Sequence, residues 1–105
     1  MSTSEIKFEI ESDEKNIPER IVWNATDKPG DQEQTRAISV AVWDHVEQNT
    51  LRIDLWTKDM PLDEMRRFYI NALAGMAESV KVATGDNEMA DAMLALCETF
   101  AGAKR

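Results

Sequence analysis

Residues 51–85 read LRIDLWTKDMPLDEMRRFYINALAGMAESVKVATG and combine two hydrophobic periods. At the start of this segment, Leu, Ile and Leu alternate with Arg, Asp and Trp, and a period of two is typical of a β-strand. Further on, apolar residues recur every three or four positions, which predicts an amphipathic helix. Pro61 suits the first turn of a helix, and Gly85 suits its left-handed end. The segment therefore predicts a strand at about 51–57 that leads directly into a long helix at about 61–84.

Two amphipathic helices are expected in the second half of the chain. On the first, which Asp59 can cap, the apolar stripe consists of Leu62, Met65, Tyr69, Ala72, Leu73, Met76, Val80 and Ala83. Asp86 or Asn87 can cap a second helix at about 87–101. Its apolar face consists of Met89, Met93, Leu96, Cys97 and Phe100. The short link predicts an antiparallel helical hairpin, whose methionines either fill gaps in the core or form an adaptable binding surface.

Three further strands are expected before residue 51. Ile6, Phe8 and Ile10 alternate with charged residues, a short β-prone run follows at 21–25, and alternation resumes at 36–43. The second of these strands is followed by a surface loop that extends to about residue 34. The link between the last two strands lacks glycine, so we expect a hairpin loop longer than two residues.

Strands that precede helices are typical of an α+β fold rather than of alternating β-α-β units. The predicted strands lie at about 5–11, 21–25, 36–43 and 51–57, and the predicted helices at about 61–84 and 87–101. We expect an antiparallel sheet of about four strands, packed by the C-terminal helical hairpin with its one long amphipathic helix. A chain of 105 residues corresponds to one α+β domain spanning 1–105.

Two tryptophans are the most informative feature of the predicted sheet. In a simple register, Trp43 and Trp56 lie on the face opposite the aliphatic residues. Indoles on a nominally outer face imply that this face is covered by a helix, by the amino-terminal strands or by a second protein chain. We expect a contact surface there, with Arg52, Asp54 and Lys58 as its charged rim.

The charge balance argues against nucleic acid as a partner. The chain has 12 Lys and Arg against 20 Asp and Glu, a formal charge of −8 that repels phosphates and anionic membrane surfaces. Residues 1–64 hold 15 acidic and 7 basic side chains, whereas residues 65–105 hold five of each. The acidic surface of the first part either keeps the protein soluble or docks a basic partner.

Residue types that carry catalysis or bind metals are scarce. The chain has one histidine, His45, and one cysteine, Cys97, so no metal site, cofactor or catalytic residue is predicted. We expect His45 to be a surface imidazole, with pH sensing or catalysis as the alternative. Cys97 lies among apolar residues and is expected to be a buried thiol in a reducing compartment. No apolar run suits a signal peptide or a membrane span, so we expect a cytoplasmic protein without direct membrane insertion.

Four segments of the sequence resemble the GldC family, the small gliding-motility-associated protein C of Bacteroidetes-type bacteria. They are WNATD at 23–27, AISVAVWD at 37–44, LRIDLWTKDM at 51–60 and DEMRRF at 63–68. The likeness runs over about residues 4–100 and is most specific at 51–68. It implies a small soluble cytoplasmic protein associated with surface gliding, without an assigned enzymatic activity, cofactor or catalytic residue.

These features lead to one main functional hypothesis and two alternatives. The main hypothesis is a non-enzymatic accessory protein that contacts a protein partner of the gliding apparatus through the surface bearing Trp43 and Trp56. The first alternative is a dimer like those of secretion chaperones, in which two copies of a small acidic chain hold a client segment. The second is an enzyme or small-ligand-binding domain, which would require a deep pocket containing His45, Tyr69 or a buried carboxylate.

Overall fold

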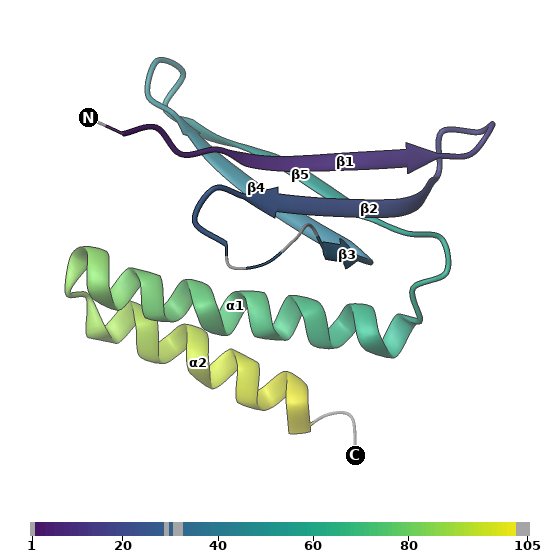
Figure 1. Ribbon diagram of the computed structural model, residues 1–105. Helices are drawn as coiled ribbons and strands as arrows, with labels where there is room; N and C mark the ends of the chain where they lie inside the picture. The colour runs from purple at the N-terminus through teal and green to yellow at the C-terminus, as the bar shows by residue number, and fades with distance from the viewer. Residues whose placement is uncertain (1, 29, 31–32, 103–105) are drawn as a thin grey trace. The chain divides into compact units, whose positions relative to one another are not determined.

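The computed structural model describes residues 2–28, 30 and 33–102 (Figure 1). These residues form β1 (Ile6–Ser12), β2 (Pro18–Ala25), β3 (Glu33–Thr35), β4 (Ala37–Asp44), β5 (Asn49–Trp56), α1 (Leu62–Thr84) and α2 (Asn87–Gly102). All the strands precede both helices and pair in antiparallel fashion, so the predicted α+β class is confirmed. The chain divides into two compact units, a strand unit at Met1–Met60 and a helical unit at Pro61–Arg105.

The strand unit contains two antiparallel sheets instead of one sheet of about four strands. The first has the order β1-β2-β3, and the second consists of β4 and β5. The strand β3 is absent from the sequence prediction because its three residues, Glu-Gln-Thr, are all polar and give no alternating pattern. Residues 29, 31 and 32, in the loop predicted before β3, lie outside the described residues.

The strand β2 begins three residues earlier than predicted. Pro18 pairs with Ser12 across an irregularity in the register, and Arg20 pairs with Glu11 through a 2.7 Å ion pair. Proline lacks the amide proton that a strand interior requires, but it is tolerated at the first residue of a strand. Residues 18–20 have no apolar pattern, so the sequence predicted β2 only from Ile21 onward. There, Ile21 and Val22 are 0% and 5% exposed and belong to the core.

The hairpin of β4 and β5 has a four-residue loop, which agrees with the prediction of a loop longer than two residues. Asp44 Oδ1 accepts hydrogen bonds from the amides of Val46 and Glu47, at 3.0 and 3.2 Å. The amide of Gln48 donates to the Asp44 carbonyl at 2.9 Å, and Gln48 adopts a φ of 58°. The Asp44 side chain thus stabilises the start of the loop, and Gln48 adopts the positive φ for which glycine is usually required.

Both helices of the helical unit begin and end at identifiable residues. The start of α1 differs from the prediction: Pro61 is its N-cap without a side-chain hydrogen bond, and the Asp59 carboxylate accepts instead from the Thr57 hydroxyl at 2.7 Å. Gly85 ends α1 with a φ of 72°, as predicted. Asp86 Oδ1 accepts from the Met89 amide at 3.0 Å, which confirms the predicted cap of α2.

Small residues bring α1 and α2 together as a hairpin (Figure 1). Ala77 and Ala90 are fully buried, and Cys97 is 8% exposed. The Cys97 thiol donates to the Ile70 carbonyl at 3.6 Å, so the predicted buried thiol is confirmed. The side of α1 that packs on α2 contains Ile70 and Ala77. It differs from the predicted apolar stripe, in which Leu62 and Tyr69 are 83% and 42% exposed.

Candidate interaction surfaces

The register of β4 and β5 places both tryptophans of the hairpin on one side. Trp43 pairs with Thr50 and Trp56 with Ala37, and residues that pair across an antiparallel ladder share a face. The other face carries Ile38, Val40, Val42, Leu51, Ile53 and Leu55. We call the side with Trp43, Trp56, Ser39, Arg52 and Asp54 the indole face. Its separation from the aliphatic face agrees with the alternation in the sequence.

Both indoles of this face are open to solvent. Trp43 is 58% exposed and Trp56 is 45% exposed. The pairing partner of Trp56, Ala37, lies six residues before Trp43 on β4, so the two indoles are roughly 20 Å apart at 3.3 Å per residue. They therefore occupy opposite ends of the indole face and cannot stack on each other.

A polar network lies between the two indoles. The Ser39 hydroxyl donates to Asp54 Oδ1 at 2.6 Å and accepts from Arg52 Nη2 at 2.6 Å. Arg52 Nη2 and Nε also donate to the two Asp54 oxygens, at 2.9 and 3.2 Å. The guanidinium of Arg52, and then the hydroxyl of Ser39, hold the pKa of Asp54 below its usual value. Arg52 and Asp54 were predicted to lie at the rim of the face but lie at its centre. The register puts the two tryptophans at opposite ends, with the polar residues between them.

The third predicted rim charge, Lys58, links the two sheets. Its ammonium lies 2.8 Å from Glu19 Oε1 and 3.1 Å from Asp13 Oδ2, and its backbone amide donates to the Pro18 carbonyl at 3.0 Å. The hydrogen bonds to Glu19 and Asp13 raise the pKa of Lys58. No local pattern predicts these pairs, because the partners of Lys58 lie 39 and 45 positions away.

One hollow brings three of the five predicted residues together. Trp56, Asp54 and Lys58 line a depression of about 300 Å³ that is completed by Asn16, Ile17, Pro18 and Leu55. Trp43 lies at the far end of the hairpin, outside this depression. The indole face therefore offers one indole beside a concave, partly polar surface and a second indole beside the β4–β5 loop.

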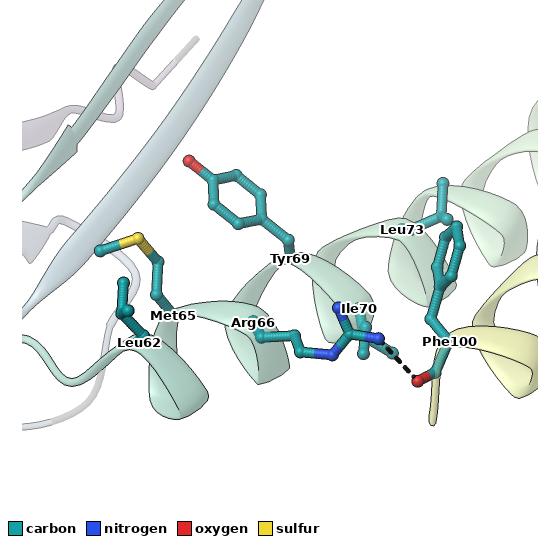
Figure 2. Close-up of a pocket in the computed structure, with 7 residues that line it drawn as sticks. All are labelled: Leu62, Met65, Arg66, Tyr69, Ile70, Leu73 and Phe100. Carbon is teal, nitrogen blue, oxygen red and sulfur yellow. Dashed lines mark hydrogen bonds between the residues drawn. The ribbon is translucent and has the colours of Figure 1, made fainter. Parts of the chain in front are cut away.

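A second candidate surface is an apolar groove on the helical unit (Figure 2). It has a volume of about 470 Å³ and is lined by Leu62, Met65, Arg66, Tyr69, Ile70, Leu73 and Phe100. Arg66 Nη2 donates to the Phe100 carbonyl at 2.9 Å, across the groove from α1 to the end of α2. A guanidinium at the carbonyl end of a helix also interacts favourably with the helix dipole. The sequence left open whether the methionines of this stripe fill the core or form a binding surface.

The residues that would mark an enzyme or ligand site do not converge in the described part of the chain. Tyr69 lines the apolar groove, while His45 is exposed in the β4–β5 loop. Among the residues that the structure describes, no group of three His, Cys, Asp or Glu side chains lies close enough to hold a metal ion. Within the same residues, neither helix has the length and apolar character needed to cross a membrane.

The relation of this chain to known proteins follows from a family model. The model described as gliding motility-associated protein GldC-like matches residues 18–105, which include the indole face and the apolar groove. No curated protein and no solved structure matches the chain. The match extends over most of the sequence and agrees with the resemblance of residues 51–68. The chain therefore belongs to the GldC-like family, whose description associates it with gliding motility.

Proposed function

We propose that this protein is a non-enzymatic accessory protein of the gliding apparatus that binds a protein partner through the indole face. The observation that carries the proposal is the exposure of two tryptophans, 58% and 45%, on one face of a hairpin. Tryptophan has a large apolar surface and is enriched among the residues that contribute most to protein–protein binding. Covering Trp43 and Trp56 with a partner removes this surface from water.

The spacing of the indoles defines the shape of the partner segment. A separation of roughly 20 Å corresponds to about six residues of extended chain. The partner therefore presents two apolar positions that far apart, one of them entering the hollow beside Trp56. Between these positions the Ser39–Arg52–Asp54 network is already hydrogen-bonded within the protein. Its groups keep these bonds in the complex, which limits the cost of removing them from water.

The perturbed ionisable groups support a role without catalysis. Hydrogen bonds and ion pairs lower the pKa values of Asp13, Asp54 and Asp59 and raise that of Lys58. Each shift favours the charged form. General acid–base catalysis near neutral pH needs the opposite, a carboxylate pKa raised or a lysine pKa lowered towards 7.

A cytoplasmic location is part of the proposal and rests on the single free thiol of Cys97.

The proposal is tested in a gliding bacterium that carries this gene. Trp43→Ala and Trp56→Ala are introduced together, and colony spreading is measured alongside the cellular level of the protein. We expect spreading to be lost while the level is maintained. Val46→Ala is the matched control, because Val46 is 75% exposed but lies in the β4–β5 loop outside the indole face. Normal spreading of the double variant would contradict the proposal.

Affinity capture identifies the partner in the same strains. Tagged wild-type protein and the Val46→Ala variant are expected to retain the same gliding-apparatus protein, and the double tryptophan variant is expected to lose it. Retention of that protein by the double variant would assign the contact to another surface.

A second candidate function is a dimer like those of secretion chaperones, which holds a client segment. The observation that favours it is the apolar groove, where Leu62 is 83% exposed beside the flexible side chain of Met65. Methionine-lined surfaces repack around different guests. This function predicts that Leu62→Asp abolishes capture of a client peptide while Trp43→Ala with Trp56→Ala does not. The reverse result supports the indole face.

A further inference from the structure

The strand β1 forms an open edge of its sheet. Among the described residues it pairs with β2 alone, in the order β1-β2-β3, and Figure 1 shows it at the border of the sheet. An edge strand presents unpaired amide and carbonyl groups to any chain that lies beside it. Ile6, at the start of β1, is also 71% exposed.

The hydrogen bonds to β2 fix which backbone groups of β1 face outward. The Thr26 amide donates to the Glu5 carbonyl at 2.9 Å, so residue 5 points its backbone towards β2. In an antiparallel ladder this direction alternates along the strand. Residues 7, 9 and 11 therefore also bond to β2, while Ile6, Phe8 and Ile10 direct their amides and carbonyls to the open edge.

This alternation restricts how a second β1 strand can pair with the first. The amides and carbonyls that point away from β2 in one copy must form hydrogen bonds with the same groups of the other copy. An antiparallel pair therefore places residues 6, 8 and 10 of the two copies opposite one another. When Phe8 lies opposite the same residue of the second copy, Ile6 meets Ile10, and Lys7 meets Glu9 twice. Shifting the register by two residues brings either Lys7 opposite Lys7 or Glu9 opposite Glu9. Like charges directly opposite each other destabilise a sheet, whereas opposite charges stabilise it.

We propose that two copies of this protein associate through their β1 edges, antiparallel and centred on Phe8. The pairing has two-fold symmetry, as homodimers commonly do. It joins two three-stranded sheets into one of six strands and sets Ile10 of one copy beside the exposed Ile6 of the other. The apolar side of β1 continues into a hollow of about 380 Å³ lined by Ile6, Phe8, Trp23, Thr35, Ala37, Ile38 and Ser39. The paired edge itself contains no residue of the indole face, although the adjacent hollow reaches Ser39, so variants of β1 test the dimer separately from the proposed function.

The pairing is expected to be weak and dependent on salt. A seven-residue edge buries less area than the roughly 800 Å² per partner of a standard stable interface. Each copy also carries a formal charge of −8, and the two copies repel each other at low ionic strength. We therefore expect association at high protein concentration, strengthened when salt screens the net charge.

Charge reversal tests the register by analytical ultracentrifugation of the full chain. Lys7→Glu places Glu opposite Glu at both sites, and Glu9→Lys places Lys opposite Lys, so each variant alone should self-associate about tenfold more weakly than wild type. Mixing the two variants places Glu opposite Lys at both sites and should restore association to the wild-type level. The control is Lys15→Glu, which makes the same change of net charge as Lys7→Glu but lies in the turn before β2.

The mixture also excludes an effect within one chain. Lys7 and Glu9 form a 3.6 Å ion pair in the monomer, and each single variant breaks it. Mixing cannot repair this intrachain pair, so recovery in the mixture reports contacts between copies. A wild-type protein that stays monomeric up to millimolar concentration, or a mixture as weak as its components, would overturn the proposal.

Cysteine cross-linking provides a second readout of the register. Phe8→Cys lies opposite itself in the proposed dimer, at about 5.5 Å between Cα atoms, which suits a disulfide. Lys7→Cys and Glu9→Cys should each cross-link poorly alone and efficiently when mixed, since residue 7 lies opposite residue 9. The wild-type chain is the control, because its one cysteine is buried. Efficient cross-linking of Lys7→Cys to itself would show a different register and contradict the proposal.

Discussion

The strand unit and the helical unit differ in the residues they expose. The strand unit contains most of the acidic excess and exposes aliphatic residues such as Ile53 on one face of the β4–β5 hairpin, and two tryptophans beside an ordered network of Ser39, Arg52 and Asp54 on the other. The helical unit is nearly balanced in charge, packs its two helices through small side chains and exposes an apolar groove. Directional polar groups combined with aromatic residues are typical of specific recognition, whereas an apolar groove is typical of adaptable binding. The comparison therefore favours the strand unit as the place where the proposed partner is recognised.

The largest expected effect is the loss of partner binding when both exposed indoles are removed. Tryptophans that dominate an interface cost about 2 kcal/mol or more each when truncated, so Trp43→Ala with Trp56→Ala should weaken binding at least about 100-fold. The affinity is measured by calorimetry with the purified partner. Thermal unfolding of the variant should be nearly unchanged, because both side chains are largely exposed. Leu62→Ala in the helical unit is the matched control and should bind like wild type.

A smaller effect is expected from overfilling the contact between the helices. Ala90 is fully buried, so Ala90→Leu should lower the free energy of unfolding by about 1–3 kcal/mol. Urea unfolding followed by circular dichroism at 222 nm measures the change. Ala92→Leu, at an exposed position of the same helix, should leave it within about 0.5 kcal/mol of wild type. Partner binding by Ala90→Leu should persist wherever the protein remains folded, and its loss would place recognition in the helical unit.

The stability of the strand unit should fall at acid pH. The pKa values of Asp13, Asp54 and Asp59 are lowered from 3.8 on folding, by hydrogen bonds and ion pairs in the strand unit. Their contribution to stability is therefore present above pH 3.8 and is lost as the pH falls through the lowered values. We expect Trp fluorescence, which reports only the strand unit because all three tryptophans lie there, to show a drop in stability below about pH 4. Asp54→Asn should reduce this drop, and an unchanged acid profile would contradict the role of the Arg52–Asp54 pair.

The smallest expected effect concerns Lys58 at alkaline pH. Its pKa is raised from 10.5 by Glu19 and Asp13, so its contribution is complete below pH 10.5 and is lost as the pH rises through the higher folded value. Lys58→Met should remove this alkaline loss and slightly destabilise the strand unit near neutral pH. Thermal unfolding at pH 7 and pH 11 measures both changes. Lys15→Met, in an exposed turn, is the control.

Local patterns predicted most of the fold. Alternation located β1, β4 and β5, and the three- and four-residue period located both helices to within about one residue at each end. The strand β3 escaped prediction because a three-residue polar strand has no apolar face. The cap of α1 was wrong because the Thr57 hydroxyl occupies the Asp59 carboxylate, a contact that competes with capping.

The sequence predicted which residues share each face of the β4–β5 hairpin, but not how far apart the two indoles lie. The parity of positions 43 and 56 sufficed to place both indoles opposite the aliphatic residues. Their separation depends on the register of β4 and β5, which is set by the four-residue loop between Asp44 and Asn49. The role of Lys58 depends on residues of another hairpin, and only the folded chain brings them together.

The central claim, that a partner covers the indole face, is tested most directly by ¹⁹F NMR of protein labelled with 5-fluorotryptophan. The chain has three tryptophans, and Trp23, with the Lys28 ammonium 5.4 Å from its ring, serves as an internal reference. In the purified protein, a soluble paramagnetic probe should broaden the Trp43 and Trp56 signals more than that of Trp23. In extracts of gliding cells, both signals should shift and lose their sensitivity to the probe, while that of Trp23 stays unchanged. Indoles already shielded in a purified monomer, or equally exposed in the extract, would contradict the account.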